Sequence, residues 1–144
     1  MTIFTIGFTK SSAEHFFGRL RSASVKRIVD IRLSNLSQLA GFTKKEDLKY
    51  FARELCGVDY LHLLDLAPTA QLMDDYKKHH LQWEEFERRF AALLRERKVE
   101  KSVDPAQVDR GALLCSEQSP QFCHRRIVAE YLAARWPKVE IVHL

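Results

Sequence analysis

The sequence lacks any apolar stretch close to the roughly 18 residues that a membrane-spanning helix needs. It also lacks the basic start and long apolar segment of a secretory signal, because residues 2–6 are instead typical of a strand. Cysteine is scarce, with 3 residues in 144, and an odd number without an export signal argues against a disulfide scaffold. These absences predict a cytoplasmic protein with reduced thiols and no membrane partner.

Long runs of one charge are missing as well. The chain has 23 Lys and Arg residues against 19 Asp and Glu, a net charge of +4, and the basic residues occur singly or in pairs. It contains neither an RNA-binding aromatic motif nor a Cys-His finger spacing. The charge is compatible with an anionic partner, either a phosphate-bearing small molecule or a nucleic acid. It leaves the oligomeric state open.

Strand-like and helix-like segments alternate along a globular composition with 46% hydrophobic and 29% charged residues. Strand patterns cover 2–6, 27–31, 60–64, 112–116 and 139–143. Helical patterns follow capping boxes at Ser11 and Thr43, cover 69–79 and 82–98, and end before Pro137. This alternation predicts one domain, residues 1–144, with an α/β three-layer sandwich fold. Its central, mostly parallel five-stranded sheet would be flanked by helices in a Rossmann-like arrangement.

Polar side chains follow three of the predicted strands, where open parallel sheets bind their ligands. The residues with a predicted ligand-binding role are Gly7, Thr9, Lys10, Asp30, Arg32 and Arg125. An arginine after an acidic residue suits phosphate or carboxylate binding, although Asp30 and Arg32 also fit a structural ion pair. Because strand residues alternate sides, Cys115 and Glu117 share one side of the fourth strand. Three segments therefore predict a common pocket at one sheet edge.

The predicted catalytic residues are Cys123, Glu117, His124 and Cys115. If the last helix begins near Pro120, Cys123 lies in its first turn, where the helix dipole and the neighbouring Arg125 favour a thiolate nucleophile. Glu117 is a candidate general base. Each has a structural alternative, since Cys115 also suits a buried strand and Glu117 also suits a helix cap or an ion pair.

A metal-binding interpretation uses some of the same residues. Cys115, Cys123 and His124 offer two sulfurs and one nitrogen, with Glu117 or Asp30 as a fourth ligand. However, adjacent cysteine and histidine residues rarely reach one metal from a helix, and no Cys-x2-Cys pair is present. The sequence therefore assigns no metal ligands and no cofactor. A disulfide between Cys115 and Cys123 would require their Cα atoms to lie within about 7 Å.

The chain resembles the DUF488 family of bacterial and archaeal proteins nearly from end to end. The resemblance rests on Thr5-Ile6-Gly7, Asp30-Ile31-Arg32, the Phe42 region, Leu113-Leu114-Cys115-Ser116-Glu117, Cys123-His124-Arg125 and Val142-His143. It implies a cytosolic α/β domain with a shared polar pocket, and it supplies no reaction.

The residues after the Thr-Ile-Gly motif depart from the family pattern. The family start usually has His and Ser after the Thr-Ile-Gly motif, whereas this chain has Phe8 and Thr9. If that histidine is a catalytic base, its role is lost here or has moved to His124, while Thr9 still supplies a hydroxyl.

Together these patterns predict an anion- or phosphate-binding pocket for a nucleotide-like or nucleic-acid-related ligand, with catalysis left open. One alternative is a non-catalytic, nucleic-acid-associated binding module, and another is a small metal-binding domain.

Overall fold

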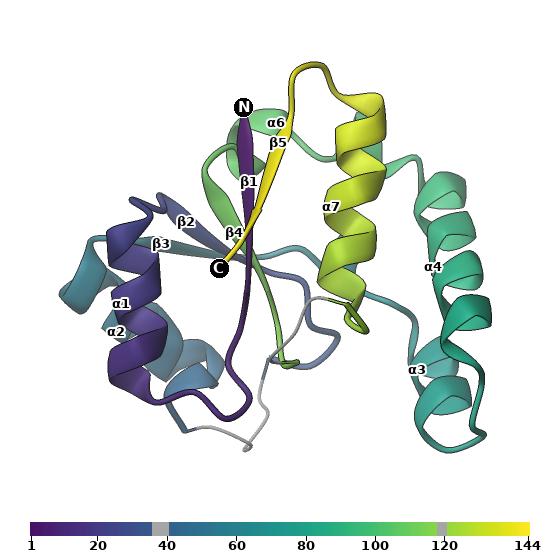
Figure 1. The fold of residues 1–144 in the computed structure, drawn as a ribbon, viewed down its shortest axis with the longest axis horizontal. Coiled ribbons are helices and arrows are strands. Elements are labelled where there is room, and N and C mark those ends of the chain that lie inside the picture. The colour runs from purple at the N-terminus through teal and green to yellow at the C-terminus, as the bar shows by residue number, and fades with distance from the viewer. Residues whose placement is uncertain (36–40, 118–120) are drawn as a thin grey trace.

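Five strands form one parallel sheet in the computed structural model of the chain, which describes residues 1–35, 41–117 and 121–144. The strands are β1 (Thr2–Gly7), β2 (Arg27–Asp30), β3 (Asp59–His62), β4 (Gly111–Cys115) and β5 (Glu140–His143). Their order is β3-β2-β4-β1-β5, and each hydrogen-bonded pair is parallel (Figure 1). The predicted α/β sandwich is confirmed.

Helices cover both faces of the sheet (Figure 1). The elements are α1 (Ala13–Ser22), α2 (Lys45–Cys56), α3 (Ala70–Lys77), α4 (Trp83–Arg97), α5 (Val99–Ser102), α6 (Pro105–Val108) and α7 (His124–Arg135), with 3-10 turns η1 (Gly41–Thr43) and η2 (Leu64–Leu66). Helices α1 and α2 pack on one face, while α4 and α7 pack on the other. Within the described residues, no helix is both long and apolar enough to cross a membrane.

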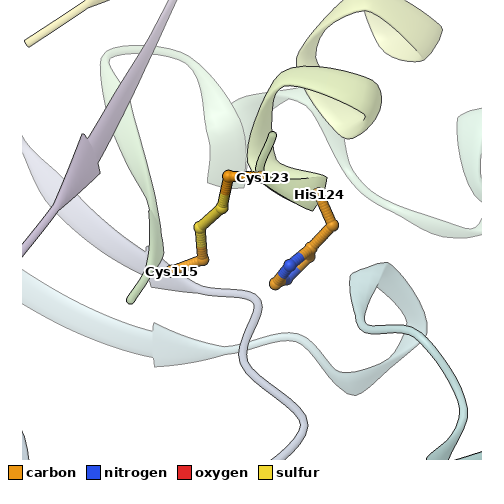
Figure 2. A group of neighbouring side chains, drawn as sticks. All are labelled: Cys115, Cys123 and His124. Atoms are coloured by element: carbon orange, nitrogen blue, oxygen red, sulfur yellow. A yellow bond between two sulfur atoms is a disulfide. The ribbon is translucent and has the colours of Figure 1, made fainter. Parts of the chain in front are cut away.

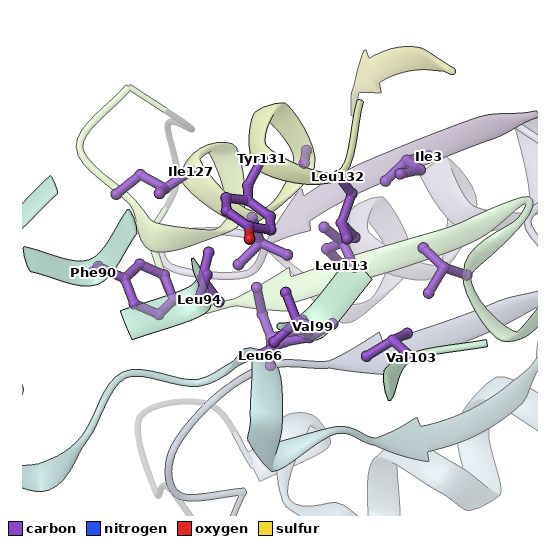
Figure 3. Close-up of a cluster of buried hydrophobic side chains, with 14 of the residues drawn as sticks. Ile3, Leu66, Phe90, Leu94, Val99, Val103, Leu113, Ile127, Tyr131 and Leu132 are labelled. Carbon is purple, nitrogen blue, oxygen red and sulfur yellow. The ribbon is translucent and has the colours of Figure 1, made fainter. Parts of the chain in front are cut away.

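The central strand β4 contributes to both hydrophobic layers because its side chains alternate between the two faces. Leu113 packs with α4 and α7 residues such as Leu94 and Leu132 (Figure 3). Ala112 and Leu114 pack on the other face against α1 and α2. All five β4 residues are buried, so this strand is fixed from both sides and holds its carboxyl end in place.

The helix starts differ in part from those the sequence predicts. The first cap is Ser12, which accepts a hydrogen bond from the His15 amide at 3.1 Å, one residue later than expected. The capping box at Thr43 is wrong, because α2 is preceded by Lys44 without a side-chain cap bond. Thr43 is instead buried in η1, where its carbonyl accepts a hydrogen bond from Arg32 at 2.7 Å. Tertiary contact replaced the local motif there.

The predicted catalytic residues lie between the end of β4 and the start of α7, at the carboxyl edge of the sheet. Strand β4 ends at Cys115, and α7 begins at His124 with Cys123 in the N-cap position. The expected start near Pro120 falls partly outside the described residues, but residues 121–123 are not helical. Cys123 therefore precedes the first turn of the helix instead of lying within it.

Candidate functional site

The sulfur atoms of Cys115 and Cys123 meet between the end of β4 and the start of α7, and the structure joins them as a disulfide (Figure 2). Their Cα atoms are 7.3 Å apart. This pairing differs from the expectation of three reduced thiols. The third cysteine, Cys56, is half-buried in α2, and its thiol donates to the Phe17 carbonyl. The pair forms because the strand end and the helix start converge on the same edge.

Arg125 lies behind this pair with its side chain fully buried. Its Nη1 donates to Cys115 Sγ at 3.4 Å, to Cys123 Sγ at 3.8 Å and to the Glu117 carbonyl. Burial, followed by the charge of Arg19, lowers the pKa of Arg125 to about 10. The guanidinium therefore stays charged at neutral pH and would stabilise either cysteine as a thiolate after reduction.

Gly7 has a packing role at this point. A Cβ atom there would overlap the Glu117 carbonyl and Nη1 of Arg125, so a side chain would displace both. The β1 end also contacts β4 through Ser116, whose carbonyl accepts hydrogen bonds from the amides of Phe8 and Thr9 at 3.3 and 2.9 Å. Both amides, including that of the predicted ligand-binding residue Thr9, are thus engaged within the protein.

Thr9, Lys10 and Glu117 lie near the surface. The Thr9 hydroxyl donates to the Ser116 carbonyl at 2.5 Å. Lys10 is exposed in a left-handed turn with φ of 61°. Glu117 is also exposed, with its carbonyl rather than its carboxylate turned to Arg125. These three residues do not line the pocket described below.

Asp30 and Arg32 form a buried ion pair at the end of β2. The Arg32 guanidinium donates two hydrogen bonds to the Asp30 carboxylate, at 2.9 and 2.8 Å, and the Tyr60 hydroxyl donates a third at 2.6 Å. Burial, with the Asp30 bond adding to it, raises the pKa of Tyr60. Nη1 of Arg32 has no hydrogen-bond partner among the described residues, and its guanidinium lies 5.4 Å from the Phe8 ring centre.

His124 faces the end of β2 from the first turn of α7. Its Nε2 is 2.8 Å from the Ile31 carbonyl, and its ring meets Phe90 edge-on with 5.7 Å between centres. Burial lowers the pKa of His124 to about 4, although the bond to Ile31 opposes the shift. The imidazole is therefore neutral at pH 7. In this state Nε2 donates its hydrogen to Ile31 and Nδ1 carries the lone pair.

A pocket of about 320 Å³ opens beside these groups at the carboxyl edge of the sheet. Its lining residues are Phe8, Arg32, Leu33, Ser34, Pro68, Met73, Asp74, Lys77, Ser116 and His124. Of the residues that the sequence predicts, the pocket brings together Arg32 and His124, while Arg125 and the two cysteines lie behind it. Lys77 was missed because no local pattern indicates how α3 is placed against the sheet. Ser116 was missed although it directly follows β4.

Cys115, Cys123 and His124 also form a compact group of potential metal ligands. Each offers one ligand atom, and these atoms lie within 4.8 Å of one another (Figure 2). Adjacent Cys123 and His124 do converge here, because Cys123 is the N-cap and its side chain turns back toward β4 while the His124 ring lies beside it.

The fully parallel sheet with helices on both faces defines an α/β sandwich protein, and the pocket lies beyond the carboxyl ends of its strands. Comparison with protein families matches residues 12–132 to the family described as Domain of unknown function DUF488. The chain belongs to this family, which confirms the resemblance found in the sequence. Comparisons with curated proteins and with solved structures gave no match.

Proposed function

We propose that the pocket at the carboxyl edge of the sheet binds a small anionic ligand that bears a phosphate group. The observation that carries the proposal is Arg32, which lines the pocket with a buried guanidinium whose Nη1 has no hydrogen-bond partner among the described residues. A buried donor without a partner destabilises a protein by about 1–3 kcal/mol. A ligand oxygen that accepted this hydrogen bond would recover that stability.

The charges around the pocket support an anion. Lys77 lies at the exposed rim from α3, so its ammonium can approach a ligand from solvent. Asp74 is the acidic residue among the lining side chains, and its carboxylate is 3.6 Å from the Lys78 ammonium. Asp30 holds the Arg32 guanidinium in place from behind. Arginine held by a carboxylate is a preorganised donor for phosphate oxygens.

Direct catalysis by the predicted nucleophile has less geometric support than binding. Cys123 and Cys115 are 3% and 1% exposed, and neither lines the pocket. The Glu117 carboxylate lies outside it. His124 is the candidate catalytic residue that does line the pocket, where Nδ1 of its neutral ring can accept a hydrogen bond. The proposal therefore concerns binding first.

Calorimetric titration with inorganic phosphate and with nucleoside monophosphates tests this function. We expect saturable binding that Lys77→Ala weakens by roughly 3- to 10-fold, equivalent to about 0.7–1.4 kcal/mol. Lys101→Ala removes the same charge from an exposed site in α5 and should leave the affinity unchanged. Equal loss in both variants, or no binding at all, would contradict a specific pocket.

Adding oligonucleotides to the titrations tests the alternative of a nucleic-acid-associated binding module. Several surface arginines of α4 and α7 are paired with acidic neighbours, including Arg88 with Glu85 and Arg126 with Glu87. If single-stranded or duplex oligonucleotides bind with steep salt dependence while nucleoside monophosphates do not, the basic surface and not the pocket is the binding site.

A further inference from the structure

We infer that Cys115, Cys123 and His124, with the cysteines reduced, form a three-ligand site for a zinc-like divalent ion whose fourth position faces the pocket. The site goes beyond the proposed anion binding and does not depend on it. It revises the sequence interpretation, which assigned no metal ligands because Cys123 and His124 are adjacent. The structure brings both to the end of β4.

The donor set suits such an ion. Two thiolates and an imidazole are the ligand types that zinc takes in proteins, at about 2.3 Å from sulfur and 2.0–2.1 Å from nitrogen. Tetrahedral coordination at those lengths places ligand atoms roughly 3.5–4 Å apart. The three groups here already lie within 4.8 Å of one another. Small side-chain rotations after reduction are therefore enough to surround an ion.

The backbone spacing favours a shared ligand over a permanent bond. The Cα atoms of Cys115 and Cys123 are 7.3 Å apart. Disulfides usually join Cα atoms about 4.4–6.8 Å apart. Two cysteines that coordinate one ion have the diameter of that ion between their sulfurs, so their backbones stand farther apart. The Cα separation of Cys115 and Cys123 lies in this wider range.

Groups around the cluster would orient the ligands. Metal-bound histidines commonly donate their second ring N–H to a backbone carbonyl, as His124 does from Nε2 to Ile31 at 2.8 Å. That bond leaves Nδ1 for the ion. Arg125 donates to both sulfurs. A positive guanidinium there is compatible with a divalent ion, because two thiolates would neutralise the charge of the ion.

The pocket gives the site an open side. His124 and Ser116, the residue after Cys115, line the pocket, whereas both cysteines are buried behind it. Water or a ligand group can therefore approach a bound ion from the pocket. Three protein ligands with one open position are typical of catalytic zinc sites, where the ion polarises a bound water or substrate oxygen.

Cobalt and zinc binding to the reduced, metal-free full chain test the inference. We expect one ion per chain by elemental analysis, and thiolate-to-cobalt charge-transfer absorption that zinc abolishes. Cys115→Ser and Cys123→Ser should each weaken binding by more than the roughly 10–100-fold that loss of an outer-shell partner causes. Cys56→Ser and His79→Gln, which change the same residue types outside the cluster, should bind as the wild type does.

Cys115 is a core residue, so its serine variant can fail to fold. A second measurement therefore uses the wild-type protein. Zinc should slow iodoacetamide modification of Cys115 and Cys123 without affecting Cys56, as read by mass spectrometry. Equal rates with and without zinc, in protein whose thiols are reduced, would overturn the metal site. Phosphate titration of the same metal-free protein shows separately whether the anion pocket stands.

Discussion

His124 holds a neutral imidazole among the β2 end, α7 and Phe90, so its protonation works against folding. The unfolded side chain titrates near pH 6.5, whereas burial lowers the folded pKa to about 4. Below pH 6.5 the unfolded state binds a proton that the folded state does not accept until about pH 4. The stability that neutral His124 provides is thus complete above pH 6.5 and is lost as the pH falls toward 4.

Denaturant unfolding of the reduced protein at pH 7, 5.5 and 4.5, with chelator present, measures this loss. We expect the free energy of unfolding to fall across that range and to fall less in His124→Gln, whose amide can still donate to Ile31. The difference between the two proteins isolates His124, because His143 also has a pKa lowered chiefly by burial. Parallel curves would show that His124 is not the group responsible.

A second prediction about single residues compares two glycines. At Gly7 an added methyl group meets the Glu117 carbonyl and Arg125, so Gly7→Ala should destabilise the protein by about 1–3 kcal/mol or more. Gly18 lies inside α1 with open space around its Cβ position, so Gly18→Ala should stabilise by roughly 0.5–1 kcal/mol. Denaturant midpoints compare them. A neutral Gly7→Ala would mean that the β1 end can move away from Arg125.

At the scale of the elements, α4 depends on one buried stripe. Leu94 is fully buried in the layer between sheet and helices, and Leu94→Ala should cost about 2–5 kcal/mol of unfolding free energy. Leu55 near the end of α2 is 48% exposed, so the same truncation should change stability by less than about 0.5 kcal/mol. Chemical denaturation tests both, and similar losses at the two sites would contradict the packing of α4.

The sequence predicts the elements well where their patterns are set locally. The helical pattern over 82–98 predicts α4 (Trp83–Arg97) to within one residue at each end. The sequence fails where distant contacts decide, as at Thr43, which is buried in η1 with its carbonyl bonded to Arg32 and is not the N-cap of α2. For the site, a strand end identifies Arg32 and the start of the last helix identifies His124, but Lys77 comes from a helix whose position depends on packing against α4.

Across the whole molecule, the sheet order explains why segments far apart in sequence build one edge. Strand β4 lies between β1 and β2, so the residues after all three strands meet although they are separated by long crossovers. His124 reaches the β2 end, and Thr9 reaches the β4 end, because of this order. Family membership over residues 12–132 covers the β2, β3 and β4 strands and most of α7.

Because β1 pairs in parallel with β5, Met1 lies where the strands begin and Leu144 lies where β5 ends. The amino group of Met1 contacts the Lys138 carbonyl at the edge where the strands begin. The Leu144 amide instead donates to the Thr5 carbonyl, farther along β1 toward the edge that carries the pocket. An affinity tag or fluorophore fused before Met1 would therefore project away from the pocket, whereas one fused after Leu144 would start much nearer to it. Labelled protein for the titrations is best made through the amino end.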